Sequence, residues 1–143
     1  MRILGIDYGE RRIGLAETDE LGMMAHGLAT LVRRGDASDF DRLAEMVRAE
    51  EVGLIVVGMP YNMDGSVGFK GEEVAAFVEE LARRVDVPVE TWDERLTTAR
   101  AEREMLAADM TRAKRARRRD RIAAQFILQS YLDAHPDLAE KGD

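Results

Sequence analysis

The chain has 143 residues, a formal net charge of −7, 45% hydrophobic and 34% charged residues, and no cysteine. This composition excludes a disordered or fibrous protein, and the lack of cysteine excludes disulfides and thiolate metal sites. The length suits one domain, so we expect a single domain over residues 1–143 with a flexible tail from about residue 135. There is neither an apolar run of roughly 20 residues nor a signal-peptide pattern, which predicts a cytoplasmic protein without membrane contact.

The first half of the chain predicts three strands and a helix. Residues 2–7 form an apolar strand, and the short turn at 9–11 joins it to a second strand over 12–19 as a hairpin. We expect a third strand over 25–32. A helical spacing of apolar residues then predicts an amphipathic helix with one buried stripe, made of Phe40, Leu43, Ala44 and Val47.

The second half alternates strands and helices. The continuous apolar run "VGLIVVGMP" suits a central strand buried on both faces, and a turn-rich loop, "YNMDGSVGF", follows it. Next come a helix, a fifth strand in "VPVETWDE", a helix in "TTARAEREMLAAD" and a last helix after a basic interruption. This order predicts an α/β fold with a mixed five-stranded sheet flanked by helices. It is similar to the element order of the ribonuclease H-like fold.

Acidic residues stand at the ends of three elements that this fold would bring together. Asp7 lies in the first apolar strand, where period-two alternation gives it the face of Ile3 and Gly5. Asp93 and Glu94 end the fifth strand, and Asp120 opens the last helix. Each acid alone also has an ordinary structural explanation, as a turn, helix-terminus or ion-pair residue. A carboxylate within an apolar strand nevertheless costs free energy unless something neutralises it.

A divalent cation is the simplest way to neutralise such a group of acids. Carboxylates that lie close together raise one another's pKa, and a bound cation removes that cost. Hard oxygen ligands favour Mg²⁺ or Mn²⁺, and the scarcity of His and Cys argues against zinc. Two such ions roughly 3.5–4 Å apart can activate water and stabilise the leaving oxygen in phosphodiester cleavage. The acids therefore predict a two-metal-ion hydrolase.

A compact basic segment, "TRAKRARRRDR" over residues 111–121, stands out on an otherwise acidic chain. The overall charge argues against nonspecific nucleic-acid binding, but a local cluster of Arg and Lys can face phosphates. The alternative is an ordinary solvated helix face. We take six residues as candidates for contacting a nucleic-acid backbone: Arg11, Arg95, Lys114, Arg117, Arg118 and Arg121.

Four motifs resemble, in order, the sequence blocks of the YqgF family of bacterial ribonuclease H-like proteins. They are "GIDYGERRIGLAETD", "VVGMPYNMDGS", "DERLTT" and "RRDRIAAQFILQSYLD", and the resemblance extends from Ile3 to about Asp133. Members of this family are described as Holliday junction resolvases or as nucleases that mature the 5′ end of 16S ribosomal RNA. The resemblance thus implies metal-dependent phosphodiester cleavage, with a ribosomal RNA precursor or branched DNA as substrate.

The same resemblance implies particular roles for individual residues. The family acids correspond to Asp7, to Glu94 or its neighbour Asp93, and to Asp120. Glu94 is preferred to Asp93 because its longer side chain can reach inward from a strand end. The second block implies a loop beside the substrate, in which we interpret three residues as turn formers: Asn62, Asp64 and Gly65.

Three other functions share parts of this pattern. Sugar kinases and actin-like ATPases begin with a similar Asp-x-Gly hairpin, but theirs carries Ser or Thr after the glycine, where this chain has Glu10 and Arg11. A binding module that has lost catalysis should lack the acids, and all of them are present. Junction resolution would need a symmetric dimer, and the sequence indicates neither an oligomeric state nor a choice between RNA and DNA.

Overall fold

The computed structural model describes residues 1–96 and 112–140, and at residues 96, 112–122 and 139–140 it describes the backbone alone. Its strands are β1 (Arg2–Tyr8), β2 (Arg12–Thr18), β3 (Ala25–Gly27), β4 (Leu31–Val32), β5 (Val52–Met59) and β6 (Val89–Asp93). Its helices are α1 (Ser38–Ala49), α2 (Phe69–Arg84), the 3-10 turn η1 (Glu94–Leu96), α4 (Arg112–Ala134) and α5 (Asp137–Glu140).

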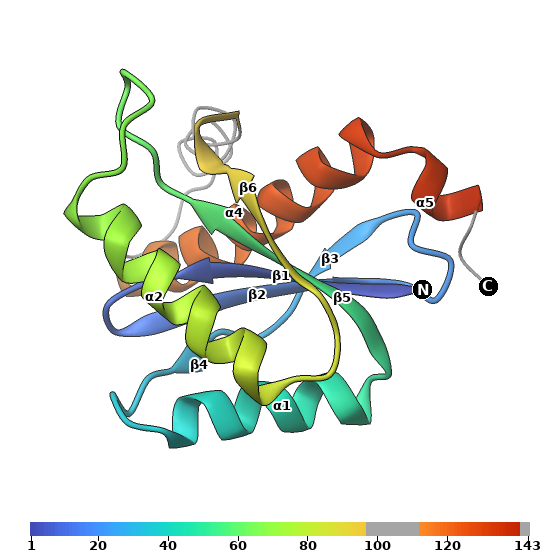
Figure 1. Ribbon diagram of the computed structural model, residues 1–143, viewed down its shortest axis with the longest axis horizontal. Coiled ribbons are helices and arrows are strands. Elements are labelled where there is room, and N and C mark those ends of the chain that lie inside the picture. Colours follow the sequence, from blue (N-terminus) through green and yellow to red (C-terminus); the bar gives the residue numbers. More distant parts are fainter. Residues whose placement is uncertain (97–111, 141–143) are drawn as a thin grey trace.

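The strands form one mixed sheet in the order β3-β2-β1-β5-β6, with β4 also paired to β2. The β1–β2 hairpin is antiparallel, whereas β5 runs parallel to β1, and β6 runs parallel to β5 (Figure 1). The predicted α/β class and mixed sheet are therefore confirmed. Because β1 and β5 lie in the middle, both are covered on two faces, which explains their nearly continuous apolar sequences.

The third predicted strand is divided into two short strands. β3 pairs with the second half of β2, from Ala16↔Gly27, and β4 pairs with its start, at Ile13↔Leu31. Between these two pairs the edge chain uses one more residue than β2 does, and this extra residue interrupts the ladder as a bulge does. In the part of the chain that the structure describes, the sheet consequently has six strands where five were predicted.

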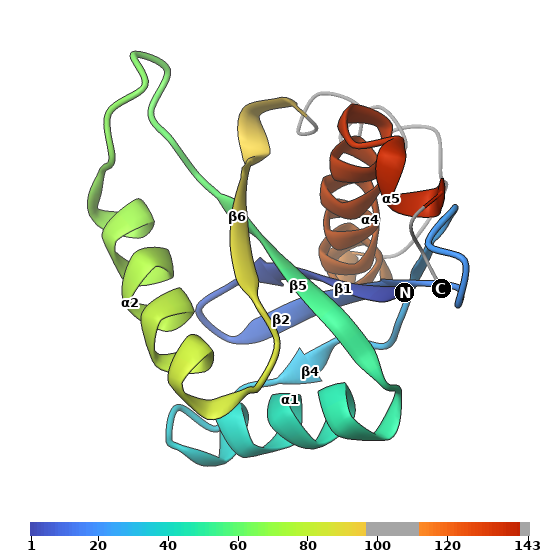
Figure 2. The ribbon, with the colours of Figure 1, turned by 45° about the vertical axis from the view of Figure 1, so that its right-hand side comes forward.

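Helices cover both faces of the sheet, and each face has its own buried core. Figure 2 shows α1 and α2 on one side and α4 on the other. The α1/α2 side buries one set of apolar side chains, which includes Leu4, Ile6, Leu43 and Phe77. The α4 side buries a second set, which includes Ile3, Val56, Ala124, Ile127 and Leu128. Alternate residues of β1 and β5 belong to opposite cores, as period-two geometry requires.

The last long helix begins earlier than the sequence predicted. We expected the basic segment to interrupt the helices and Asp120 to open the final one, but α4 already starts at Arg112 and contains the basic residues. Arg, Lys and Ala are all good helix formers, so nothing in this segment breaks the helix. The helix predicted in "TTARAEREMLAAD" lies outside the described residues.

The segment after α4 packs back onto the protein. α5 follows at Asp137–Glu140, and Leu138 contacts the core on the α4 side. The His135 ring stacks on the Tyr131 ring with centroids 4.1 Å apart. We expected a flexible tail over this region. That expectation, and the assignment of residues 1–143 to a single domain, stay predictions. Across residues 1–96 and 112–140, no helix is long and apolar enough to cross a membrane.

Candidate active site

Asp7 lies near the C-terminal end of β1, on the face that α4 covers. Its face follows from its neighbours, because Ile3 is fully buried in the α4-side core and a Cβ placed on Gly5 would contact α4. Period-two alternation puts Asp7 on the same side as these two residues. The packing of Ile3 and Gly5 against α4 therefore supports the face predicted for Asp7. A central strand holds a carboxylate more rigidly than a loop would.

Glu94 reaches the same face from the end of β6. It opens η1, directly after the last residue of the strand. Its Oε2 atom lies 3.3 Å from the position that a Cβ on Gly58 would occupy. Because Ile6 pairs with Val57 in the parallel β1–β5 ladder, Gly58 is level with Asp7. The structure therefore brings Asp7 and Glu94 to the same corner of the α4 face.

Two glycines make this corner possible. A Cβ on Gly58 would lie 2.5 Å from Ile127 Cδ1, and one on Gly5 would lie 2.8 Å from Leu128 Cβ and 3.2 Å from the Ala124 carbonyl oxygen. Side chains at these positions would force α4 away from the sheet. Gly58 also leaves the space that the Glu94 carboxylate occupies, so it serves the site as well as the packing.

The electrostatic environment of Glu94 suits a cation site. Burial raises the pKa of Glu94, and the nearby negative charge of Asp93 raises it further, while the positive charge of Lys70 lowers it. When the pKa of a carboxyl is raised by folding, its ionisation reduces the free energy of unfolding. A cation bound beside the carboxylate offsets this loss. Lys70, in the first turn of α2, is a site neighbour that the sequence analysis did not identify. Its position directly after the β5–α2 loop was the available signal.

Asp93 faces away from this corner and pairs with Arg95. The Arg95 guanidinium donates to both Asp93 carboxylate oxygens, at 2.7 to 3.1 Å, and the Arg95 backbone N–H donates to Oδ1 at 3.0 Å. These hydrogen bonds hold the pKa of Asp93 below its usual value. Of the two acids that the sequence left as alternatives, the structure groups Glu94 with Asp7 and Asp93 with Arg95.

Arg95 also anchors the loop between β5 and α2. Its Nη1 donates to the carbonyls of Asn62 and Met63, at 3.2 and 3.4 Å. Within the loop Gly65 has a positive φ of 88°, and Asp64 accepts a hydrogen bond from the Ser66 backbone N–H at 2.9 Å. The turn-forming roles predicted for the loop residues are confirmed. Arg95, a candidate for nucleic-acid contact, is largely occupied by these partners.

Asp120 lies in the N-terminal half of α4, one turn before Ala124. Ala124 is fully buried against β1, and Ile127 and Tyr131 are buried on the same helix face. The sheet-facing side predicted for Asp120 stays a prediction, although the described residues one and more turns later on this helix do pack on the sheet. Its side chain lies outside the described part, as do the side chains of Lys114, Arg117, Arg118 and Arg121. Arg11 is exposed in the β1–β2 turn.

Among the side chains that the structure describes, no three acidic, His or Cys groups gather closely enough to hold a metal ion. Of the four acids predicted to hold metal, the structure describes the side chains of three, Asp7, Asp93 and Glu94. Both Asp7 and Glu94 interact with neighbouring groups. The third predicted acid, Asp120, belongs to α4, and its part in the site stays a prediction.

Known proteins similar to this chain carry the names of nucleic-acid enzymes. A relative from Clostridium acetobutylicum, named "Putative pre-16S rRNA nuclease", is 46% identical over 134 residues, which is 94% of this chain and 99% of the relative. A relative of the same name from Halalkalibacterium halodurans is 49% identical over 136 residues, covering 93% of this chain and 96% of the relative.

Solved structures support the fold. RuvC of T. thermophilus, in complex with a Holliday junction substrate, has a TM-score of 0.58 at 20% identity and covers 96% of both chains. The fowlpox virus resolvase, solved with junction DNA, has a TM-score of 0.56 at 14% identity over 94% of this chain and 98% of that one. The sequence profile of the RuvX family, described as Holliday junction resolvase, matches residues 1–134. Together with the relatives above, this match shows that the chain belongs to the RuvX family, the family that the four sequence motifs resemble.

Proposed function

We propose that this protein is a metal-dependent nuclease that hydrolyses a phosphodiester bond of precursor 16S ribosomal RNA, at its 5′ end, in the cytoplasm. The observation that carries the proposal is the half-buried Glu94 carboxylate beside Gly58, which is level with Asp7 in the neighbouring strand. Family membership and the names of the relatives supply the class of substrate.

The described residues fit a hard divalent cation. The donors are carboxylate oxygens, which Mg²⁺ and Mn²⁺ prefer, and burial has raised the pKa of one of them. Asp7, Glu94 and Asp120 would hold the ions, and Asp93 would support the site through Arg95. When bound, such ions supply Lewis acidity, which activates water and stabilises the leaving oxygen.

The remaining charged residues would bind and orient the substrate. Lys70 lies close enough to affect Glu94 and can meet a phosphate oxygen at the same corner. The basic half of α4, with Lys114, Arg117, Arg118 and Arg121, and the exposed Arg11 would hold the nucleic-acid backbone along the edge of the sheet. Arg95 keeps the β5–α2 loop in place beside the site.

Resolution of Holliday junctions is the second candidate function. The description of the family profile favours it. The acids can cleave RNA and DNA alike, because their chemistry acts on the phosphodiester and not on the sugar or base. A resolvase would need two copies of this site arranged by a symmetric dimer.

A paired cleavage assay tests both functions. The wild type, Asp7→Asn and Glu94→Gln are incubated with Mg²⁺ or Mn²⁺ and either a precursor RNA 5′ segment or a four-way DNA junction. We expect metal-dependent cleavage of the RNA, reduced at least about a hundredfold in both variants. Glu45→Gln, at an exposed acid on α1, is the matched control and should retain full activity, whereas Asp93→Asn should lose less activity than Glu94→Gln. Symmetric cuts in the junction alone would establish the resolvase instead, and metal-dependent binding without any cleavage would refute the nuclease.

A further inference from the structure

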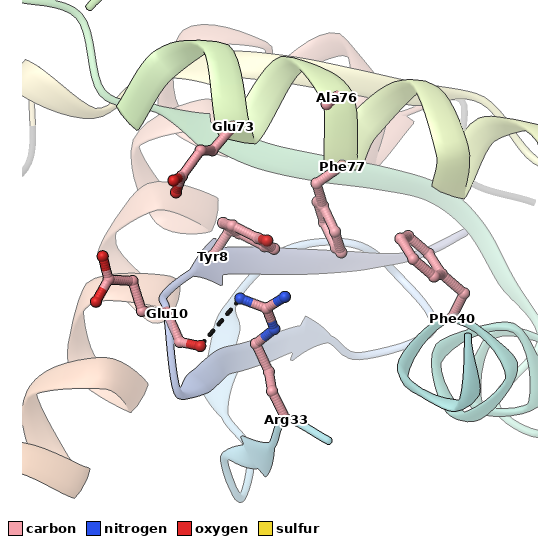
Figure 3. Close-up of a pocket in the computed structure, with 7 residues that line it drawn as sticks. All are labelled: Tyr8, Glu10, Arg33, Phe40, Glu73, Ala76 and Phe77. Carbon is pink, nitrogen blue, oxygen red and sulfur yellow. Dashed lines mark hydrogen bonds between the residues drawn. The ribbon is translucent and has the colours of Figure 1, made fainter. Parts of the chain in front are cut away.

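A second concave site lies on the opposite face of the sheet from Glu94. It is a pocket of about 490 Å³ at the end of β1, between the β1–β2 turn, α1 and α2 (Figure 3). Six of the residues that line it carry the argument: Tyr8, Glu10, Arg33, Phe40, Glu73 and Phe77. Tyr8 directly follows Asp7 in β1, so consecutive residues of one strand point to the two sites.

The apolar walls of the pocket are aromatic. The Tyr8 and Phe77 ring centroids are 4.5 Å apart, and those of Phe40 and Phe77 are 5.5 Å apart. The Arg33 guanidinium lies over the Tyr8 ring, 4.6 Å from its centroid. Planar aromatic and guanidinium groups of this kind are the surfaces on which unpaired nucleobases stack.

Arg33 is held firmly in this arrangement. Its Nη1 donates to the carbonyls of Gly9 and Glu10, both at 3.0 Å, and its Nε lies 3.6 Å from the buried Asp39 carboxylate. In the described part of the chain its Nη2 makes no hydrogen bond. The pocket therefore presents a fixed donor beside an aromatic wall.

Two carboxylates complete the lining. Glu73 points from α2 toward Tyr8, and Glu10 extends from the β1–β2 turn (Figure 3). Neither side chain has a hydrogen bond or ion pair with another residue of the described chain. When ionised, these carboxylates accept hydrogen bonds and cannot donate them. They therefore suit a ligand that offers N–H donors and disfavour a phosphate.

We propose that this pocket binds an unpaired guanine base. Guanine is a planar base that offers two adjacent donors, N1–H and N2–H, which a single carboxylate such as that of Glu73 can accept together. Its O6 or N7 acceptor suits the Nη2 group, the part of the Arg33 guanidinium not engaged by Gly9, Glu10 or Asp39. Adenine and cytosine would present one amino group to Glu73, and uracil one imino group, so guanine is the best match.

This inference rests on the proposed function, because the base would belong to the RNA whose backbone is cut on the other face of β1. The same chemistry could also accept guanine from a free nucleotide. The acidic lining favours a base whose phosphates lie outside the pocket, as in an extruded residue of a strand.

The first test uses equilibrium dialysis of the full chain with radiolabelled guanosine, adenosine, cytidine and uridine. Guanosine should bind most tightly, and Glu73→Gln should weaken it about tenfold, since one bidentate base contact is lost. Ala76→Leu, on the exposed rim of the pocket, should also weaken binding by filling the space. Glu72→Gln and Ala75→Leu are matched controls on exposed positions outside the pocket, and thermal unfolding confirms that all four variants fold.

The second test distinguishes RNA from free nucleotide. Without added metal, so that nothing is cut, fluorescence anisotropy compares a uridine oligonucleotide with the same strand carrying one guanine, and GTP serves as the competing free ligand. Tighter binding of the guanine strand, lost in Glu73→Gln, is expected. Tighter binding of GTP would assign the pocket to free nucleotides. Equal binding of the four nucleosides, or unchanged affinity in Glu73→Gln, overturns the proposal, while metal-dependent cleavage that needs Asp7 would leave the proposed function standing.

Discussion

Gly58→Ala should cause two separable defects, one of packing and one of the site. The new methyl carbon would stand 2.5 Å from Ile127 Cδ1, about 1 Å short of an ordinary carbon contact. Overpacking of this kind costs about 1–3 kcal/mol, and replacing a glycine inside a strand returns about 0.5–1 kcal/mol. We therefore expect a net loss of about 1–2 kcal/mol in the free energy of unfolding.

Ile127→Val removes the clashing atom and so provides a rescue. By itself it should cost about 1 kcal/mol. The double variant should be about as stable as Ile127→Val alone, giving a coupling energy of about 1–2 kcal/mol. Its nuclease activity should stay low, because the methyl group still lies 3.3 Å from the Glu94 carboxylate.

Urea unfolding at 25 °C of the wild type, both single variants and the double variant measures this coupling. Gly5→Ala, with and without Ile127→Val, is the control, since its contacts are with Leu128 and the Ala124 backbone. Those two losses should add. Additive losses at Gly58 as well would refute the inferred contact between Gly58 and α4.

Three further predictions concern buried and paired charges. Because burial raises the pKa of Glu94 in the folded state, ionisation of Glu94 reduces the free energy of unfolding as pH rises from about 4.5. Glu94→Gln should therefore be more stable than the metal-free wild type at pH 7. The variant should also lose the rise in unfolding temperature that Mg²⁺ gives the wild type. Asp39 is 3% exposed, and burial alone would raise its pKa, but hydrogen bonds from two backbone N–H groups and from Arg42 outweigh that effect and lower it. Asp39→Asn should reduce the free energy of unfolding by about 2–3 kcal/mol in urea at pH 7. This difference should shrink below pH 4, as the wild-type acid is protonated. Arg95→Ala should accelerate amide hydrogen exchange in the β5–α2 loop while α1 keeps its protection, and unchanged exchange there would contradict the anchoring role.

The elements whose apolar pattern is strong could be predicted from sequence. The run of β5 and the face of Asp7 in β1 depend on local periodicity, which the chain itself displays. The division between β3 and β4 could not be predicted, because it depends on how many residues the partner strand uses. The start of α4 was missed because a cluster of like charges suggested a break, whereas intrinsic helix propensity continued the helix.

For the site, the sequence predicted the acids but not their neighbours. The alternative between Asp93 and Glu94 turns on which face each side chain takes at the end of β6, and the Arg95 ion pair that separates them is a tertiary feature. Lys70 and Gly58 acquire their roles only when α2 and α4 are placed on the sheet. The aromatic pocket joins residues from β1, α1 and α2 that are up to about seventy positions apart in the chain, a separation that periodicity does not reveal.

The docking of α4 onto Gly5 and Gly58 has a consequence for when the enzyme can act. The proposed acids are residues 7, 94 and 120, and the last belongs to the helix that closes this face of the sheet. While α4 of a nascent chain is still inside the ribosome, two of the proposed acids would lie on a sheet face that no helix covers. If Asp120 completes the proposed site, the three acids come together only after α4 has folded onto the sheet.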